Sequence, residues 1–193
     1  MNRPPRLPTL CPTLAALAAL AALAVLAAQN ARAAEPAPRD RIERGRYLVQ
    51  TTGCADCHTP LKPGPRGPEP DAARSLAGHP EDLVMPPLPV LPAGPWQVLS
   101  SATNTAWAGP WGVSFTANLT PDPETGLGRW REQDFVQTLR TGRHLGRGRP
   151  LLPPMPAAYG QMAEADLKAM FAYLRTLPPV RNRVPAPLPP AAR

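Results

Sequence analysis

Two cysteines and a histidine form the most distinctive chemical group of the chain, in the run Cys54-Ala55-Asp56-Cys57-His58. This C-x-x-C-H spacing is typical of a covalent haem attachment site, where the two thiols add to the vinyl groups of the haem. The histidine that follows is placed to bind the iron from one face. A disulfide or half of a metal site is the alternative, but the one other cysteine, Cys11, lies near the N-terminus and offers no second ligand pair.

The opposite face of the iron needs a second ligand if the site is to be closed. Met155 is the preferred candidate, because prolines on both sides hold its backbone extended and reduce the entropy lost in presenting the thioether. Met85 also precedes prolines and is a rival, while His79 and His144 offer imidazole instead. An iron bound by His58 and Met155 has no free position for a substrate, which favours electron transfer.

Three helices are expected to position these groups. The first is predicted over residues 41–52, ending at Gly53 directly before the motif. The second is predicted over residues 131–141, and the last has apolar residues at helical spacing over residues 167–177. Gly45, inside the first helix, costs about 1 kcal/mol relative to alanine, which indicates the close approach of another helix.

The apolar periodicity disappears over residues 60–110, where prolines make regular helix or strand improbable. The sequence therefore predicts an all-α domain with a long Pro-rich loop insertion at 60–110. Residues 179–193 are rich in proline, alanine and arginine and are expected to form an extended tail.

Residues 1–33 have the pattern of an export signal, with arginines, then a Leu/Ala run, then an A-x-A cleavage pattern. An uncleaved N-terminal anchor is the alternative. Removal of this segment leaves 18 basic and 14 acidic residues, an excess too small to indicate nucleic-acid binding. The rest of the chain has the length of one domain.

The letters N-L-T-P-D-P-E-T-G-L-G-R-W begin at Asn118. With the C-A-D-C-H motif, they resemble class I c-type cytochromes, particularly the cytochrome subunits of membrane-bound bacterial alcohol and aldehyde dehydrogenases. The resemblance covers residues 40–178 and implies a cytochrome c-like fold around one covalent haem c. It also implies hydrogen bonds from Asn118 and Thr120 to the haem edge, with an ordinary Asx-type turn as the alternative. The family's distal ligand follows this segment, which favours Met155 over Met85.

Similar cytochromes cross their first and last helices at a glycine and an aromatic residue, which here implies Gly45 with Phe171 or Tyr173. The function implied is that of a periplasmic single-electron carrier, not an enzyme, between a dehydrogenase and the respiratory chain. Expected partners are a periplasmic or membrane dehydrogenase, a terminal oxidase or another cytochrome. The protein itself is expected in the periplasm, with attachment to the outer face of the bacterial inner membrane as the alternative. A peroxidase-like haem enzyme or gas sensor with an open sixth position, and a structural relay subunit, are the alternatives.

Overall fold

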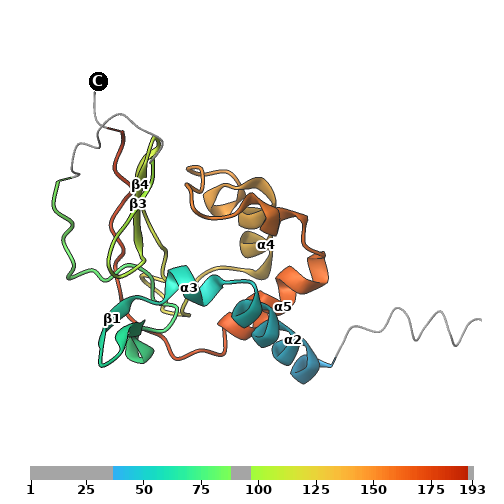
Figure 1. Ribbon diagram of the computed structural model, residues 1–193. Coiled ribbons are helices and arrows are strands. Elements are labelled where there is room, and N and C mark those ends of the chain that lie inside the picture. The colour runs from blue at the N-terminus through green and yellow to red at the C-terminus, as the bar shows by residue number, and fades with distance from the viewer. Residues whose placement is uncertain (1–36, 88–96, 191–193) are drawn as a thin grey trace, which may run out of the picture. The chain divides into compact units, whose positions relative to one another are not determined.

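The computed structural model describes residues 37–87 and 97–190 (Figure 1). The predicted export signal at residues 1–33 lies outside the described residues. The described helices are α2 (Pro38–Thr51), α3 (Cys54–His58), α4 (Glu132–Thr141) and α5 (Glu164–Leu174), with 3-10 turns η1 (Ala72–Arg74), η2 (His144–Gly146) and η3 (Ala157–Gln161). Of these helices, none is long and apolar enough to cross a membrane.

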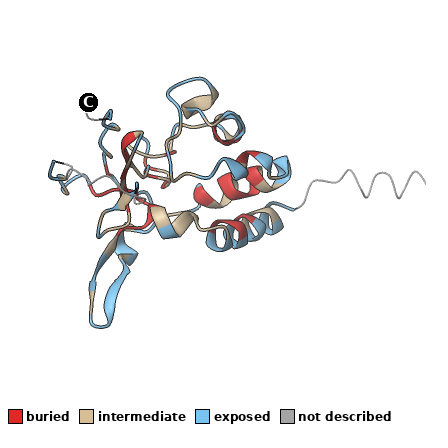
Figure 2. Cartoon of the chain, turned by 45° about the horizontal axis from the view of Figure 1, so that its top comes forward, coloured by how far each residue is buried: buried red, intermediate tan, exposed pale blue. Residues whose placement is uncertain are grey.

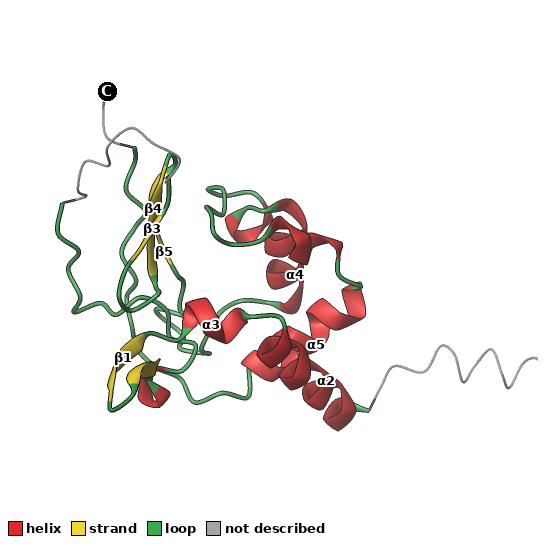
Figure 3. Cartoon of the chain, viewed as in Figure 1, coloured by secondary structure: helices red, strands yellow, loops and turns green. Residues whose placement is uncertain are grey.

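Five short strands form two antiparallel sheets. The strands are β1 (Leu61–Gly64), β2 (Gly67–Pro70), β3 (Leu99–Ser100), β4 (Ala106–Gly109) and β5 (Gly112–Phe115). The first two pair with each other, and the other three form a sheet of order β3-β4-β5. Figure 3 shows the strands gathered on one side of the α3 helix and the three longer helices on the other.

The all-α class predicted from the sequence is therefore wrong. All of β1 to β4 lie between residues 60 and 110, where the prolines were expected to exclude strands. Proline is tolerated in a two-stranded ribbon because each strand has an outward edge that needs no N–H donor. Pro63 faces Pro68 across this hairpin, whose β2 strand is exposed along its whole length (Figure 2).

The core lies where α2, α4 and α5 pack together. Its buried apolar side chains come from all three helices and from two loops, and they are Leu48, Val49, Leu76, Leu127, Phe135, Val136, Leu139, Leu167, Met170, Phe171 and Leu174. Each helix follows the predicted apolar spacing, with α5 ending three residues before Leu177.

The close helix approach predicted at Gly45 is confirmed. A Cβ atom built on Gly45 of α2 would overlap the Ala169 carbonyl oxygen of α5 and lie 2.9 Å from the Tyr173 Cβ atom. Of the two expected aromatic partners, Tyr173 is the one at this crossing. Phe171 packs instead on Phe135 of α4, with ring centroids 5.5 Å apart.

The C-terminal segment at residues 179–190 is extended and joined to the body by specific hydrogen bonds. The buried Asn182 side chain donates to the carbonyls of Ala77 at 2.7 Å and His79 at 2.8 Å. Further along, Leu188 and Val113 exchange two backbone hydrogen bonds of 2.9 Å. This segment therefore fixes the loop around residue 78 and extends the pairing of β5.

We expect Gly45→Ala to lower the free energy of unfolding by about 1–3 kcal/mol, because the added methyl group must push α2 away from α5. Helix propensity alone predicts the opposite sign, a gain of about 1 kcal/mol. Urea unfolding followed by circular dichroism measures the difference. Gln50→Ala, on the exposed side of α2, is the control, and equal or higher stability of Gly45→Ala would contradict the packing argument.

Candidate haem site

The attachment motif forms a helix of its own. Gly53 takes a left-handed conformation, φ 85°, which separates the end of α2 from the start of α3. The motif then fills the whole of α3, Cys54 to His58. Burial raises the pKa of both Cys54 and Cys57, so both are neutral thiols near neutral pH.

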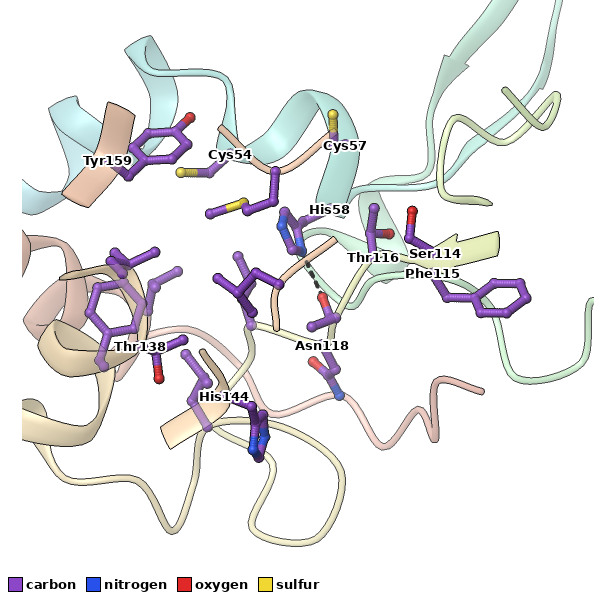
Figure 4. Close-up of a pocket in the computed structure, with 18 of the residues that line it drawn as sticks. Cys54, Cys57, His58, Ser114, Phe115, Thr116, Asn118, Thr138, His144 and Tyr159 are labelled. Carbon is purple, nitrogen blue, oxygen red and sulfur yellow. Dashed lines mark hydrogen bonds between the residues drawn. The ribbon is translucent and has the colours of Figure 1, made fainter. Parts of the chain in front are cut away.

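The His58 ring is held in one tautomer. Its Nδ1 atom lies 2.7 Å from the Ala117 carbonyl oxygen, the contact dashed in Figure 4. A carbonyl only accepts, so Nδ1 carries the proton and Nε2 keeps its lone pair. Burial lowers the pKa of His58, which favours the neutral imidazole. Nε2 is hydrogen-bonded to none of the described residues and is the nitrogen available to a metal.

A cavity of about 380 Å³ opens beside α3. Its wall includes Cys54, Cys57, His58 and Met155. Apolar side chains dominate the remainder, and they include Leu119, Leu127, Phe135, Leu139, Leu151, Leu152, Met170 and Leu174. A mostly apolar pocket of about 300–1,000 Å³ with a few polar groups is typical of cofactor sites.

Met155 and Met85 are placed differently. Met155 lines the cavity and packs against the core, whereas Met85 is not among the lining residues. The structure thus brings the preferred methionine, and not its rival, to the cavity that holds His58.

The two other histidines also differ. His79 is fully buried, and both ring nitrogens are engaged, Nδ1 with the Thr105 hydroxyl at 2.9 Å and Nε2 with the Leu83 carbonyl at 3.0 Å. His144 lines the cavity and packs edge-on against Trp130, with ring centroids 5.2 Å apart. Besides His58, His144 is therefore the other histidine that lines the candidate site.

Asn118 and Thr120 have partners within the chain. The Asn118 Oδ1 atom accepts from the Thr120 backbone N–H at 3.0 Å and from its hydroxyl at 2.7 Å, which forms an Asx-type turn. The Asn118 amide donates to the Val180 carbonyl at 2.8 Å. Asn118 lines the cavity and Thr120 does not. The hydrogen bonds expected from both residues to a haem edge stay a prediction.

The hydroxyl-bearing residues that line the cavity were not predicted from the sequence. Ser114, Thr116 and Tyr159 all line the cavity (Figure 4). The Thr116 hydroxyl oxygen is buried and has no hydrogen-bond partner in the described part of the chain. A signal existed for Ser114 alone, since it lies between apolar neighbours in a strand, but a four-residue strand is too short for alternation to stand out.

The residues of this cavity fit a haem c. Two thiols can bind such a haem covalently, a neutral imidazole with a free Nε2 can bind its iron, and a thioether is a suitable second iron ligand. All four groups line one apolar cavity. The unpartnered Thr116 hydroxyl adds a polar atom that a bound group can satisfy.

Comparison with known proteins agrees with this chemistry. The chain is 31% identical over 75% of its length to a nicotinate dehydrogenase component of Pseudomonas putida. It is 28% identical over 72% of its length to the cytochrome c subunit of the quinone alcohol dehydrogenase of Gluconobacter oxydans. The fructose dehydrogenase cytochrome subunit of Gluconobacter japonicus gives the same identity and coverage. No family model matches the chain.

The predicted resemblance is thereby confirmed: the chain is similar to the cytochrome c subunits of bacterial dehydrogenases. This similarity supports an electron-transfer cytochrome that binds haem c. The chain spans only part of these relatives, matching 9% of the nicotinate dehydrogenase component and 22% of each of the other two.

We expect Cys54→Ser/Cys57→Ser to abolish covalent haem attachment, because a hydroxyl does not replace the thiol that adds to a vinyl group. Intact-protein mass spectrometry under denaturing conditions should show one haem on the wild-type polypeptide and none on the variant. Asp56→Ser, inside the same helix, is the matched control and should keep its haem. A haem that stays bound to the double variant after denaturation would contradict this assignment.

Proposed function

We propose that this chain is a monohaem c-type cytochrome that carries single electrons and has no catalytic activity of its own. Its iron ligands are His58 and Met155, and its haem is bound through Cys54 and Cys57. The observation that carries the proposal is that these four side chains line one apolar cavity, with the His58 Nε2 atom left free by the hydrogen bond at Nδ1.

The residues of the chain suit outer-sphere electron transfer. When bound, the haem supplies an iron that alternates between Fe(III) and Fe(II). The Ala117 carbonyl fixes the His58 ring, so the ligand does not reorient between the two states. A thioether from Met155 favours Fe(II), and apolar walls disfavour the extra charge of Fe(III). Both raise the reduction potential.

We place the protein in the periplasm, with a dehydrogenase as its electron donor. The export pattern at residues 1–33 supports the location. The relatives support the donor, since they belong to dehydrogenases for alcohol, fructose and nicotinate. Electrons received there pass on toward the respiratory chain.

A basic group borders the cavity on the α4 side. Arg143, Arg147 and Arg149 are all exposed, and none of them forms an ion pair with a carboxylate among the described residues. Arg149 and His144 reach the cavity wall. Unpaired cations beside a redox centre raise the rate of encounter with an anionic partner. The proposal therefore includes an acidic docking surface on the partner.

We expect Met155→Ala to open the sixth position, so that the reduced variant binds carbon monoxide readily and has a lower reduction potential than the wild type. Absorption spectra in both oxidation states and a redox titration measure these changes. Met85→Ala is the matched control and should change neither property. Unaltered spectra in Met155→Ala, or ready carbon monoxide binding by the wild type, would reject the closed site.

We expect Arg149→Gln to slow oxidation of the reduced protein by ferricyanide about 2- to 5-fold at low ionic strength, because the cation at the cavity wall is removed. The difference should fade at about 0.15 M salt, where charges are screened over about 8 Å. Stopped-flow spectroscopy measures the rates. Arg66→Gln, in the exposed β1–β2 turn, is the control. An equal decrease in the oxidation rate of Arg66→Gln would show that the rate depends only on the net charge of the protein.

A further inference from the structure

The loop that carries Met155 has few hydrogen-bond donors of its own. Pro153, Pro154 and Pro156 have no backbone N–H, so Met155 has the only one among these four residues. That N–H is used inside the loop, toward the Leu152 carbonyl at 3.2 Å. Any polar attachment of this part of the loop to the rest of the protein must therefore come from donors elsewhere.

One such donor is Ser114 of β5. Its hydroxyl lies 2.5 Å from the Pro153 carbonyl, two residues before Met155, and farther from the Trp107 carbonyl at 3.3 Å. Ser114 is buried and lies in the wall of the same cavity. A buried hydroxyl that donates into a loop without free donors fixes the position of that loop relative to the strand.

A second attachment lies on the other side of the methionine. The Tyr159 hydroxyl, four residues after Met155, donates to the Thr52 carbonyl. Thr52 lies two residues before Cys54, at the start of the attachment motif. Tyr159 thus joins the loop to the segment that holds the haem covalently.

The strand that holds the loop also leads to the support of His58. Three residues after Ser114, the chain reaches Ala117, whose carbonyl accepts from the His58 Nδ1 atom. One short stretch of backbone therefore contacts the Met155 loop through Ser114 and the His58 ring through Ala117.

We propose that Ser114 and Tyr159 are positioning residues that hold the Met155 thioether at the iron. This inference rests on the proposed function, in which Met155 is the sixth ligand. A variant that lacks either hydroxyl still has the Met155 thioether. Its loop is held less firmly, so the thioether dissociates from the iron more often. A neutral hydrogen bond of this kind changes an equilibrium by about 2- to 10-fold.

The test uses the haem-loaded protein with Ser114→Ala and Tyr159→Phe. We expect each variant to bind carbon monoxide in the reduced state about 2- to 10-fold more tightly than the wild type, since the gas competes with Met155. Covalent haem content by mass spectrometry should not change. Each variant is an independent test of the proposal, because the two hydrogen bonds hold opposite ends of the loop.

The controls remove hydroxyls elsewhere. Ser100→Ala deletes a hydroxyl of β3 that bonds Asn104 at 3.0 Å, and Tyr173→Phe deletes one on α5 near Gly45. Both should leave carbon monoxide affinity unchanged. If Met155→Ala opens the site while Ser114→Ala and Tyr159→Phe match these controls, the positioning inference is overturned and the ligand assignment stands. If Met155→Ala changes nothing, the proposed function itself fails.

Discussion

The hydrogen bond from the His58 ring to the Ala117 carbonyl is the constraint on which the other features of the site depend. His58 is the last residue of a five-residue helix, which is too short to fix its side chain alone. The backbone at this point is held as well, since the Gly78 N–H donates to the His58 carbonyl at 2.8 Å. Gly78 has φ 79°, and a Cβ atom there would overlap the backbone of residues 116 and 117. A larger side chain at residue 78 would push the Gly78 N–H, which bonds the His58 backbone, away from the Ala117 carbonyl, which bonds the His58 ring.

The parts of the chain outside the helices hold the backbone that supports His58. The Asn118 amide, next to the acceptor of His58, donates to Val180 in the C-terminal segment. The same segment bonds the loop around Gly78 through Asn182. The C-terminal segment and the β3-β4-β5 sheet therefore enclose the support of His58, while α2, α4 and α5 form the core on the other side (Figure 1).

The sequence predicted the features that depend on local spacing. The helices follow from apolar residues three or four positions apart, and the attachment motif from five consecutive residues, so α2, α4 and α5 lie close to their expected bounds. The sheets could not be predicted, because strands of two to four residues have no usable period. Contacts such as Ser114 with Pro153 and Asn182 with Ala77 join residues 39 and 105 positions apart. No local pattern marks such pairs, and the acceptors are backbone carbonyls that every residue carries.

The placement of charge is consistent with electron exchange at one side of the cavity. Burial lowers the pKa of both His58 and His79, so the two buried imidazoles are neutral near neutral pH. The positive charge nearest the cavity is then that of Arg149 at its wall, close in the chain to Arg143 and Arg147. A neutral interior disfavours the extra charge of an oxidised metal, whereas cations at the rim interact mainly with a partner in solvent and are screened by salt. Under the proposed function, the buried neutral residues act mainly on the reduction potential, and the exposed arginines act mainly on the encounter with a partner.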